Sequence, residues 1–486
     1  MPVDGDTVRV IVEKVLDRLG ESPPETSVPT PRRSGEAYPL QLPESLSGAL
    51  DNIDAAVAAA RKSFEQYGRL PLELRSSLLT ALRQAALEQN ERWARMAVEE
   101  TGLGRVDDKI TKNNLSIQKT PGLEDLKTEA RSGDRGLSIE ELAPWGVIGA
   151  ILPSTNPIAT VIHNAISMLA AGNAVVFNPH PAATGVTIDC IRVMNSAIVA
   201  AGGPANLVTT VKKPTVETAT QLMAHTGVAL LAVTGGPGVV KAAFASGKKV
   251  IAAGPGNPPV VVDETADPCK AAQAIVDGAG FDNNVVCLDE KEIIVVDGAA
   301  DALKEALKAA GAFELGREDW RRLAQMVLAE PGGPSKEGAP NKTYVGKDAS
   351  TLLTALGMEG AGEPRILFAE VAPEDPFVWT EQLMPAVPLV RVADADEAID
   401  FARKAEGGRR HTAVMHSKNI EKLSAMARAM DCSIFVKNGP AIAGIGGGGE
   451  GHTSFTIASP TGEGLTSARS FVRRRRCTLV DYFRIV

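Results

Sequence analysis

The chain has 486 residues, of which 44% are hydrophobic and 23% are charged, and its formal net charge is −8. A chain of this length is too long for a single hydrophobic core, so two or three domains are predicted. The composition is that of an ordinary soluble globular protein. The acidic balance argues against general nucleic-acid binding. The five cysteines form no C-x-x-C pair and only six histidines are present, so no zinc-site spacing emerges and no metal is expected.

A short segment at the start of the chain is predicted to form an amphipathic helix. Residues 7–19 place apolar side chains on one face at helical spacing, with Val10 as the exception. Residues 20–41 hold five prolines and are predicted to be a linker. Because so short a helix is marginal alone in water, we expect it to dock on another protein; packing on its own domain is the alternative. Its acidic start argues against a secretory signal.

Alternating strands and helices are predicted from residue 146 onwards, after a helical stretch at 42–101. Short apolar strands between helices indicate βαβ units and parallel sheets covered on both faces, which bind ligands at the carboxyl ends of their strands. The predicted strands are 147–152, 174–177, 207–211, 228–233, 250–253, 260–262 and 292–296, and the predicted helices are 159–171, 184–201, 216–225, 239–245, 267–277 and 300–310.

One long stretch without charge needs an explanation. Residues 143–188 contain no Asp, Glu, Lys or Arg, as a membrane span would, but Pro153, Pro157 and His163 interrupt the stretch. Two buried strands with a helix between them explain it better, so no membrane partner is expected.

Cys287 is the candidate nucleophile. It follows the polar, turn-forming run Asp282–Asn284 and precedes an apolar strand, which favours a loop edge where a thiolate can be exposed. A buried, inert thiol is the commoner fate of cysteine and is the alternative.

Two further motifs stand where strands end. Thr234–Gly238 follows a strand and opens a helix, where Gly235 and Gly236 would let backbone N–H groups approach a pyrophosphate; a plain tight turn is the alternative. Pro153–Pro157 closes the first strand, and the amide of Asn156 could help to stabilise an oxyanion there. An ordinary Asn-Pro turn is the alternative at that point.

Two late motifs are interpreted as structural. Gly444–Gly449 matches G-x-G-x-x-G but lacks the strand and helix on either side, so a packed or flexible loop is favoured over a dinucleotide site. Arg473–Arg476 precedes the strand-like residues 478–480. Salt bridges or a contact between subunits are favoured there over nucleic-acid binding.

From about Leu42 to its end, the chain resembles the aldehyde dehydrogenase superfamily in its CoA-acylating branch. The resemblance is strongest to the propionaldehyde and acetaldehyde dehydrogenases of bacterial microcompartments. It rests on stretches in the same order along the chain, namely 120–122, 153–157, 178–181, 234–236, 254–258, 282–287, 436–440, 451–454 and 473–477.

The resemblance implies an α/β aldehyde dehydrogenase fold with a Rossmann-like dinucleotide-binding domain, an α/β catalytic domain and a small β oligomerisation element. It implies that Cys287 is the nucleophile, with Asn156 and the Cys287 backbone N–H as oxyanion donors. Asn178 replaces the family's lysine at the adenosine ribose, and Glu381 matches the acid that holds the nicotinamide ribose. The residues implied to bind NAD and coenzyme A are Thr155, Asn178, His180, Gly235, Gly236, Gly254, Pro255, Gly256 and Glu381.

One departure distinguishes the acylating branch. Hydrolytic relatives carry a water-activating Glu in a Glu-Leu-Gly-Gly segment, whereas the corresponding residues 252–257 here contain no acid. Without a general base, water attacks a thioester slowly, while a thiol is a good nucleophile. We therefore expect oxidation of a short aliphatic aldehyde, propionaldehyde rather than acetaldehyde, to acyl-CoA with NAD⁺. A hydrolytic enzyme and a catalytically silent scaffold are the alternatives.

The same resemblance suggests how the chain is divided. We expect the cofactor-binding domain at 42–253, with 452–469 returning to it, the catalytic domain at 254–451, and oligomerisation strands at 129–142 and 470–486 that build a dimer or tetramer. Residues 1–19 resemble encapsulation peptides. They are expected to bind shell proteins in the lumen of a cytoplasmic bacterial microcompartment.

Overall fold

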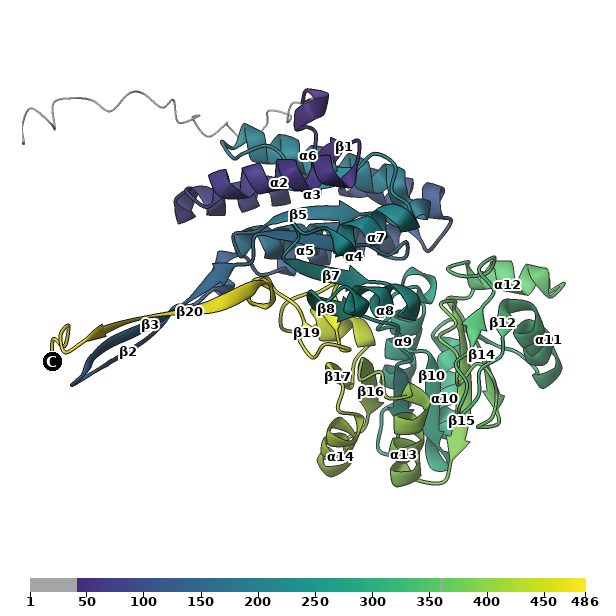
Figure 1. Ribbon diagram of the computed structural model, residues 1–486. Coiled ribbons are helices and arrows are strands. Elements are labelled where there is room, and N and C mark those ends of the chain that lie inside the picture. Colours follow the sequence, from purple (N-terminus) through teal and green to yellow (C-terminus); the bar gives the residue numbers. More distant parts are fainter. Residues whose placement is uncertain (1–41, 359, 361) are drawn as a thin grey trace, which may run out of the picture.

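The computed structural model describes residues 42–358, 360 and 362–486. The predicted helix at 7–19 and the linker at 20–41 lie outside the described residues. Two parallel sheets with helices packed on them form the body of the molecule, and a three-stranded antiparallel arm extends away from it (Figure 1). The α/β class predicted from the sequence is confirmed.

The first sheet has six parallel strands in the order β1-β6-β5-β4-β7-β8. Its strands are β1 (Ala49–Leu50), β4 (Val147–Ile151), β5 (Ala174–Asn178), β6 (Val208–Val211), β7 (Leu230–Thr234) and β8 (Lys249–Ala253). The helices of this half are α2 (Ile53–Tyr67), α3 (Leu72–Thr101), α4 (Val106–Lys119), α5 (Pro157–Ala170), α6 (Thr184–Ala200), α7 (Val216–Ala224) and α8 (Pro237–Ala245).

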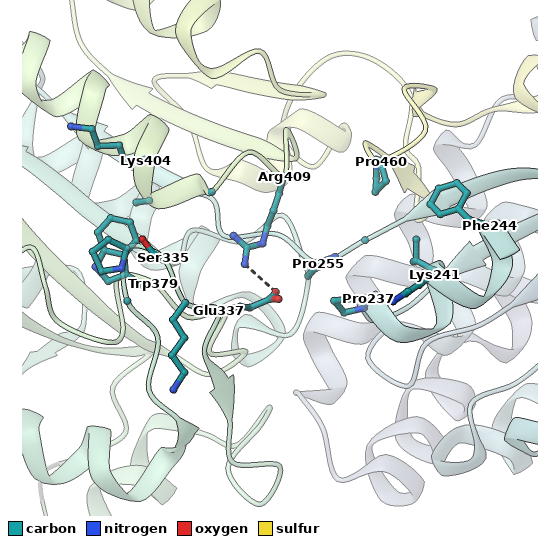
Figure 2. A pocket seen from close by; sticks show the side chains of 17 residues that line it. Pro237, Lys241, Phe244, Pro255, Ser335, Glu337, Trp379, Lys404, Arg409 and Pro460 are labelled. Atoms are coloured by element: carbon teal, nitrogen blue, oxygen red, sulfur yellow. Dashed lines mark hydrogen bonds and ion pairs between the residues drawn. The ribbon is translucent and has the colours of Figure 1, made fainter.

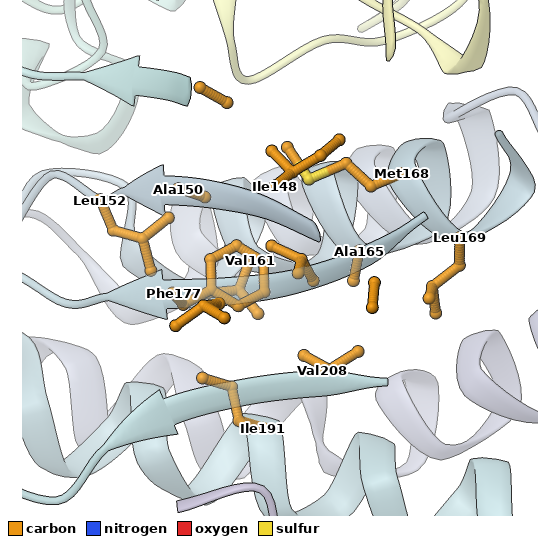
Figure 3. Close-up of a cluster of buried hydrophobic side chains, with 14 of the residues drawn as sticks. Ile148, Ala150, Leu152, Val161, Ala165, Met168, Leu169, Phe177, Ile191 and Val208 are labelled. Carbon is orange, nitrogen blue, oxygen red and sulfur yellow. The ribbon is translucent and has the colours of Figure 1, made fainter. Parts of the chain in front are cut away.

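The uncharged stretch forms the centre of this sheet. Its strands β4 and β5 and the helix α5 between them are buried along their whole length. Figure 3 shows side chains of β4, β5 and β6 packed against those of α5 and α6. In the described part of the chain, one helix, Pro181–Ala200, is long and apolar enough to cross a membrane, but more than half of its apolar window is buried in the fold. A core helix passes the same test.

The second sheet has seven parallel strands in the order β11-β14-β15-β10-β9-β16-β17. These strands are β9 (Pro259–Val262), β10 (Glu292–Val296), β11 (Ala312–Glu314), β14 (Ile366–Val371), β15 (Ala386–Val392), β16 (Thr412–His416) and β17 (Ile434–Lys437). The helices here are α9 (Pro268–Ala279), α10 (Asp297–Ala309), α11 (Arg317–Val327), α12 (Ala349–Ala355), α13 (Ala395–Glu406) and α14 (Ile420–Met430). Every strand and helix predicted from residue 147 to 310 is confirmed, with ends that differ by a few residues.

The strand order locates the cofactor edge of the first sheet. The chain runs from β4 outwards through β5 to β6, then returns to the other side of β4 for β7 and β8. In such sheets, ligands bind in the crevice at the carboxyl ends of the strands where the order reverses. That point lies between β4 and β7, so Asn156 and Gly235, which follow these two strands, stand on the same edge.

The antiparallel arm consists of β2 (Glu129–Gly133), β3 (Gly136–Pro144) and β20 (Val472–Val480). The strand expected towards the end of the chain is present as β20, and it begins before residues 478–480 because the arginine run is itself part of it. Arg474 and Arg476 form ion pairs with Glu140 on the neighbouring β3, at 3.0 and 3.1 Å, which neutralises charge that would otherwise oppose the pairing. The salt bridges expected for this run are thereby confirmed, whereas its role between subunits stays a prediction.

The segment between the second sheet and the arm contacts both halves of the body. Ala458, Ala468 and Phe471 pack into the core of the first sheet, while Phe455 and Ile457 pack into the core of the second. The short pairs β12 (Leu328–Glu330) with β13 (Ala339–Pro340) and β18 (Ile457–Ala458) with β19 (Gly464–Leu465) complete the strands. The domain boundaries drawn from the sequence stay predictions.

Candidate active site

The loop that carries Cys287 connects α9 to β10 and turns sharply just before the cysteine. Asp282, Asn283 and Asn284 have φ values of 46°, 56° and 64°. Most side chains avoid this left-handed region, but Asp and Asn tolerate it. The polar run seen in the sequence is therefore what allows the chain to bend and present the cysteine at the junction of the two sheets.

Buried lysines hold this loop in place. Lys109 Nζ donates to Asp282 Oδ2 at 2.9 Å, and Lys112 Nζ donates to the same oxygen. Lys291 Nζ donates to Asn284 Oδ1 at 2.6 Å and to its carbonyl oxygen at 3.0 Å. Because hydrogen bonds to charged groups are worth more than neutral ones, these contacts can stabilise a backbone conformation that would otherwise be unfavourable.

Cys287 itself is half-buried. Burial and the neighbouring Glu381 carboxylate raise the pKa of its thiol to about 12, although the charge of Lys291 acts in the opposite direction. The sequence led us to expect a loop edge where a thiolate can be exposed, whereas the raised pKa favours the protonated thiol. A proton acceptor must therefore act before this sulfur can attack. All five cysteines are free.

Asn156 is not the ordinary helix-capping residue that its Asn-Pro sequence suggests. It occupies the N-cap position of α5, yet its side chain makes no capping hydrogen bond. Instead its Oδ1 accepts from Lys112 Nζ at 2.6 Å, and its Nδ2 donates to Thr155 Oγ1 at 3.1 Å. The side chain is thus held by Lys112 and Thr155, and its role as an oxyanion donor stays a prediction.

A residue that the sequence did not single out, His411, lies beside the cysteine loop. A β-carbon on Gly256 would come within 2.3 Å of the Cys287 carbonyl oxygen and 3.1 Å of His411 Cγ, so all three groups meet at that glycine. Nδ1 of the buried His411 ring is 2.8 Å from Thr412 Oγ1, while its Nε2 has no partner. Burial, Lys291 and Arg409 lower the pKa of His411 to about 3, which keeps the ring neutral.

Glu381 joins the same group of residues. Its Oε1 accepts the backbone N–H of Gly256 at 3.1 Å, and burial raises the pKa of its carboxyl above the usual value. The structure thus brings Cys287, Gly256 and Glu381 together, although they lie far apart in the chain.

A cavity of about 590 Å³ opens next to this group, between α8 and the loops of the second half. Its lining includes Gly254 and Pro255 but not Cys287. Figure 2 shows the ion pair of Arg409 with Glu337, at 3.2 Å, in the middle of the cavity. Cationic side chains line it from both sides, namely Lys241, Lys336, Lys404 and Arg409.

The glycine turn between β7 and α8 borders this cavity. A β-carbon on Gly236 or Gly238 would meet no other atom within 4 Å, so the turn faces open space rather than packed protein. Pro237, which begins α8, also lines the cavity. An exposed helix start next to lysines suits a phosphate group. The part of the chain that the structure describes contains no cluster of His, Cys, Asp or Glu that could hold a metal ion.

Asn178 and His180 both form hydrogen bonds with other residues of the chain. Asn178 Oδ1 accepts from Thr218 Oγ1 at 2.6 Å, and its Nδ2 donates to the Thr215 carbonyl at 3.4 Å. The exposed His180 accepts the backbone N–H of Ala182 at its Nδ1, at 3.1 Å. Asn178 ends β5 and His180 follows it, at the carboxyl edge of the first sheet, but neither lines the cavity, so their contact with adenosine stays a prediction.

Comparison with known proteins places this site in a family. The model of the aldehyde dehydrogenase family matches residues 44–465. The chain is 52% identical to an acetylating acetaldehyde dehydrogenase of Escherichia coli over 440 residues, which cover 90% of this chain and 94% of that protein. The chain belongs to the aldehyde dehydrogenase family.

Two solved structures resemble the chain throughout its described body. One is the propionaldehyde dehydrogenase of Rhodopseudomonas palustris, solved with bound CoA and an acylated cysteine; it is 49% identical, with a TM-score of 0.87 and coverage of 90% of this chain and 98% of that one. The other is the propionaldehyde dehydrogenase of the Clostridium phytofermentans fucose utilisation microcompartment, 45% identical, with a TM-score of 0.87 and coverage of 90% and 100%.

Proposed function

We propose that the protein is a CoA-acylating aldehyde dehydrogenase that converts a short aliphatic aldehyde to its acyl-CoA with NAD⁺. Propionaldehyde is the favoured substrate and acetaldehyde the alternative, because similar proteins carry both names. The observation that carries the proposal is the surroundings of Cys287. The segment from Gly254 to Asn257, which meets it at Gly256, contains no carboxylate and so lacks the water-activating Glu that the resemblance assigns to this segment in hydrolytic relatives.

The first step joins the aldehyde to Cys287. The thiol gives up its proton, and His411 Nε2 is the nearby group with a free lone pair to take it. The sulfur then bonds to the carbonyl carbon, and the carbonyl oxygen becomes an oxyanion. Asn156 Nδ2 and the Cys287 backbone N–H donate to that oxyanion in the thiohemiacetal.

The second step oxidises the thiohemiacetal to a thioester. NAD⁺, when bound, accepts the hydride that leaves the former aldehyde carbon. The C=O bond re-forms as the oxyanion collapses, so no negative charge remains for Asn156 to stabilise. Cys287 stays acylated.

The third step transfers the acyl group. His411 first releases the proton of the first step to solvent. Coenzyme A would then supply the attacking thiol, whose proton goes to His411, and the Cys287 thiolate expelled from the tetrahedral intermediate takes that proton back from His411. A phosphate-bearing ligand next to Arg409 would offset one of the charges that hold the His411 pKa low, and so make the ring a better base. The net reaction converts aldehyde, NAD⁺ and CoA to acyl-CoA, NADH and a proton.

The residues around the cavity fit both nucleotides. NAD⁺ and coenzyme A share an ADP portion, and we assign its phosphates to the turn at Gly235 and Gly236, which is open at Gly236, and to the lysines of the cavity. Thr155, Gly254 and Pro255 would border the path from there to Cys287. Two bulky nucleotides that use the same groove must bind in turn, which gives a ping-pong order.

Cys287→Ala tests the chemical assignment. It should abolish NADH formation. It should also abolish the mass increase from an acyl-enzyme that we expect when the wild-type protein is incubated with acyl-CoA. Cys432→Ala is the matched control, because Cys432 is also half-buried and burial likewise raises its pKa to about 12, and this variant should keep its activity. Retained turnover in Cys287→Ala would refute the role of this residue.

We further propose that the enzyme works as a homo-oligomer inside a bacterial microcompartment. The arm supports an oligomer: its strands project from the body (Figure 1), and apolar side chains at the end of the chain, including Val480, Tyr482 and Ile485, are exposed. A second subunit would cover them and build a dimer or tetramer. The proposed location in a microcompartment is supported by the amphipathic pattern of residues 7–19 and by the microcompartment origin of the similar Clostridium protein.

A further inference from the structure

Lys112 is not one of the candidate site residues, but it contacts two parts of the candidate active site, the cysteine loop and Asn156. The side chain comes from α4 and is only 2% exposed. Its Nζ reaches Asp282 Oδ2 on the cysteine loop, Asn156 Oδ1 at 2.6 Å and the carbonyl oxygen of Thr155 at 3.4 Å. One ammonium group therefore contacts both the loop that carries the nucleophile and the amide proposed to face the oxyanion.

This contact determines which way the Asn156 amide points. A lysine ammonium has three donors and no acceptor, so the amide atom that faces it must be the oxygen. The amide NH₂ is then turned away from Lys112. Thr155 Oγ1 takes one of its two hydrogens at 3.1 Å, and the second is left for a substrate oxygen.

The charge of Lys112 also strengthens this donor. Lys112 Nζ donates to Asn156 Oδ1 at 2.6 Å, so its ammonium group lies directly against the carbonyl oxygen of the amide. A positive charge on the carbonyl side of an amide draws electron density from its N–H groups, and in a site shielded from water this effect is not screened.

We propose that Lys112 is a positioning residue for acyl transfer: it orients and polarises Asn156 so that its free N–H stabilises the oxyanion on the substrate of Cys287. The inference rests on the proposed function. It adds a residue that contacts neither the substrate nor the cofactors and acts through another side chain.

The neighbouring Lys109 provides the matched control. It lies on the same helix, is 3% exposed and pairs with the same Asp282 oxygen at 2.9 Å, but the described contacts of its side chain do not include Asn156. In Lys112→Met and in Lys109→Met, Asp282 keeps one lysine partner. The two variants should therefore have similar melting temperatures and similar rates of Cys287 alkylation by iodoacetamide.

Catalysis should separate the two variants. Lys112→Met should lower kcat for NADH formation and for the reverse acyl-CoA reduction by about 10- to 100-fold, the value of one charge-assisted hydrogen bond, while the KM for aldehyde and the NAD⁺ affinity stay unchanged. Lys109→Met should change kcat by less than about 3-fold. Equal losses in the two variants would mean that Lys112 only neutralises Asp282, and would overturn the proposal.

A double-mutant cycle tests whether Lys112 acts through Asn156. Asn156→Ala alone should lower kcat by about 100- to 1000-fold, as the loss of an oxyanion donor does. Adding Lys112→Met to it should then cost little more, because the amide that Lys112 orients is gone. Full additivity would contradict the proposal even if Lys112→Met alone is slow. Absence of CoA-dependent turnover in the wild-type protein would instead refute the proposed function, so the two failures are distinguishable.

Discussion

Gly256 is the residue where a single added carbon should disturb the site most directly. In Gly256→Ala the new β-carbon would lie 2.3 Å from the Cys287 carbonyl oxygen, whereas β-carbons essentially never come closer than 3.0 Å to another heavy atom. The difference, about 0.7 Å, must be absorbed by backbone rather than by a flexible side chain, and the His411 ring at 3.1 Å blocks one direction of movement. A displacement near 1 Å of a reacting group can cost about 100-fold in rate, so we expect kcat to fall by about 30- to 100-fold.

The assay is initial-rate NADH formation with saturating aldehyde and CoA, together with the Cys287 alkylation rate. Gly298→Ala in α10 is the control, because its β-carbon would meet only Glu264 Cβ at 3.8 Å, an ordinary contact, and alanine favours a helix. It should leave both rates unchanged. If Gly256→Ala is folded and both of its rates equal those of the wild type, the close approach of this glycine to Cys287 is wrong.

Three further outcomes are expected. Because the pKa of Cys287 is raised, its alkylation rate should keep rising with pH beyond 9 rather than level off near 8.5, and a plateau below pH 8 would contradict the raised pKa. Glu381→Gln removes the adjacent negative charge and should therefore increase the alkylation rate at pH 8. Phe177→Ala should destabilise the first sheet by about 3–5 kcal/mol in urea unfolding, because the ring is fully buried in its core; a loss under about 1 kcal/mol would mean that this core is loosely packed. Deletion of residues 1–19 should leave turnover intact but abolish co-purification with shells, and unchanged encapsulation would refute the targeting role.

Local sequence patterns were sufficient for the elements and for the turn before Cys287, whereas the role of Cys287 as nucleophile came from the family resemblance and stays a prediction. The stretch at 143–188 alternates short apolar strands with a helix and lacks charge because β4, α5 and β5 are covered on every side. The turn before Cys287 could be expected because the run 282–284 consists of residues that accept left-handed backbone, a property that is local to the chain.

The contacts that tune the site could not be predicted in the same way. His411 and Lys112 reach the cysteine loop only through tertiary packing, and nothing in their own neighbourhoods distinguishes them from buried structural residues. Burial is the main cause of the raised pKa of Cys287, and Glu381, which accepts a hydrogen bond from Gly256, raises it further. Salt bridges were expected for the arginine run in β20, but their partner, Glu140, could not be identified because it lies on a strand that is distant in the sequence.

The most direct test of the proposed activity is NAD⁺ reduction by the full-length protein with propionaldehyde, with and without CoA, while the products are identified by mass spectrometry. We expect sustained NADH formation only when CoA is present, with one propionyl-CoA formed for each NADH. Sustained turnover to free propionate without CoA would contradict the account. It would mean that a base near Cys287, with Glu381 the adjacent carboxylate, activates water against the thioester.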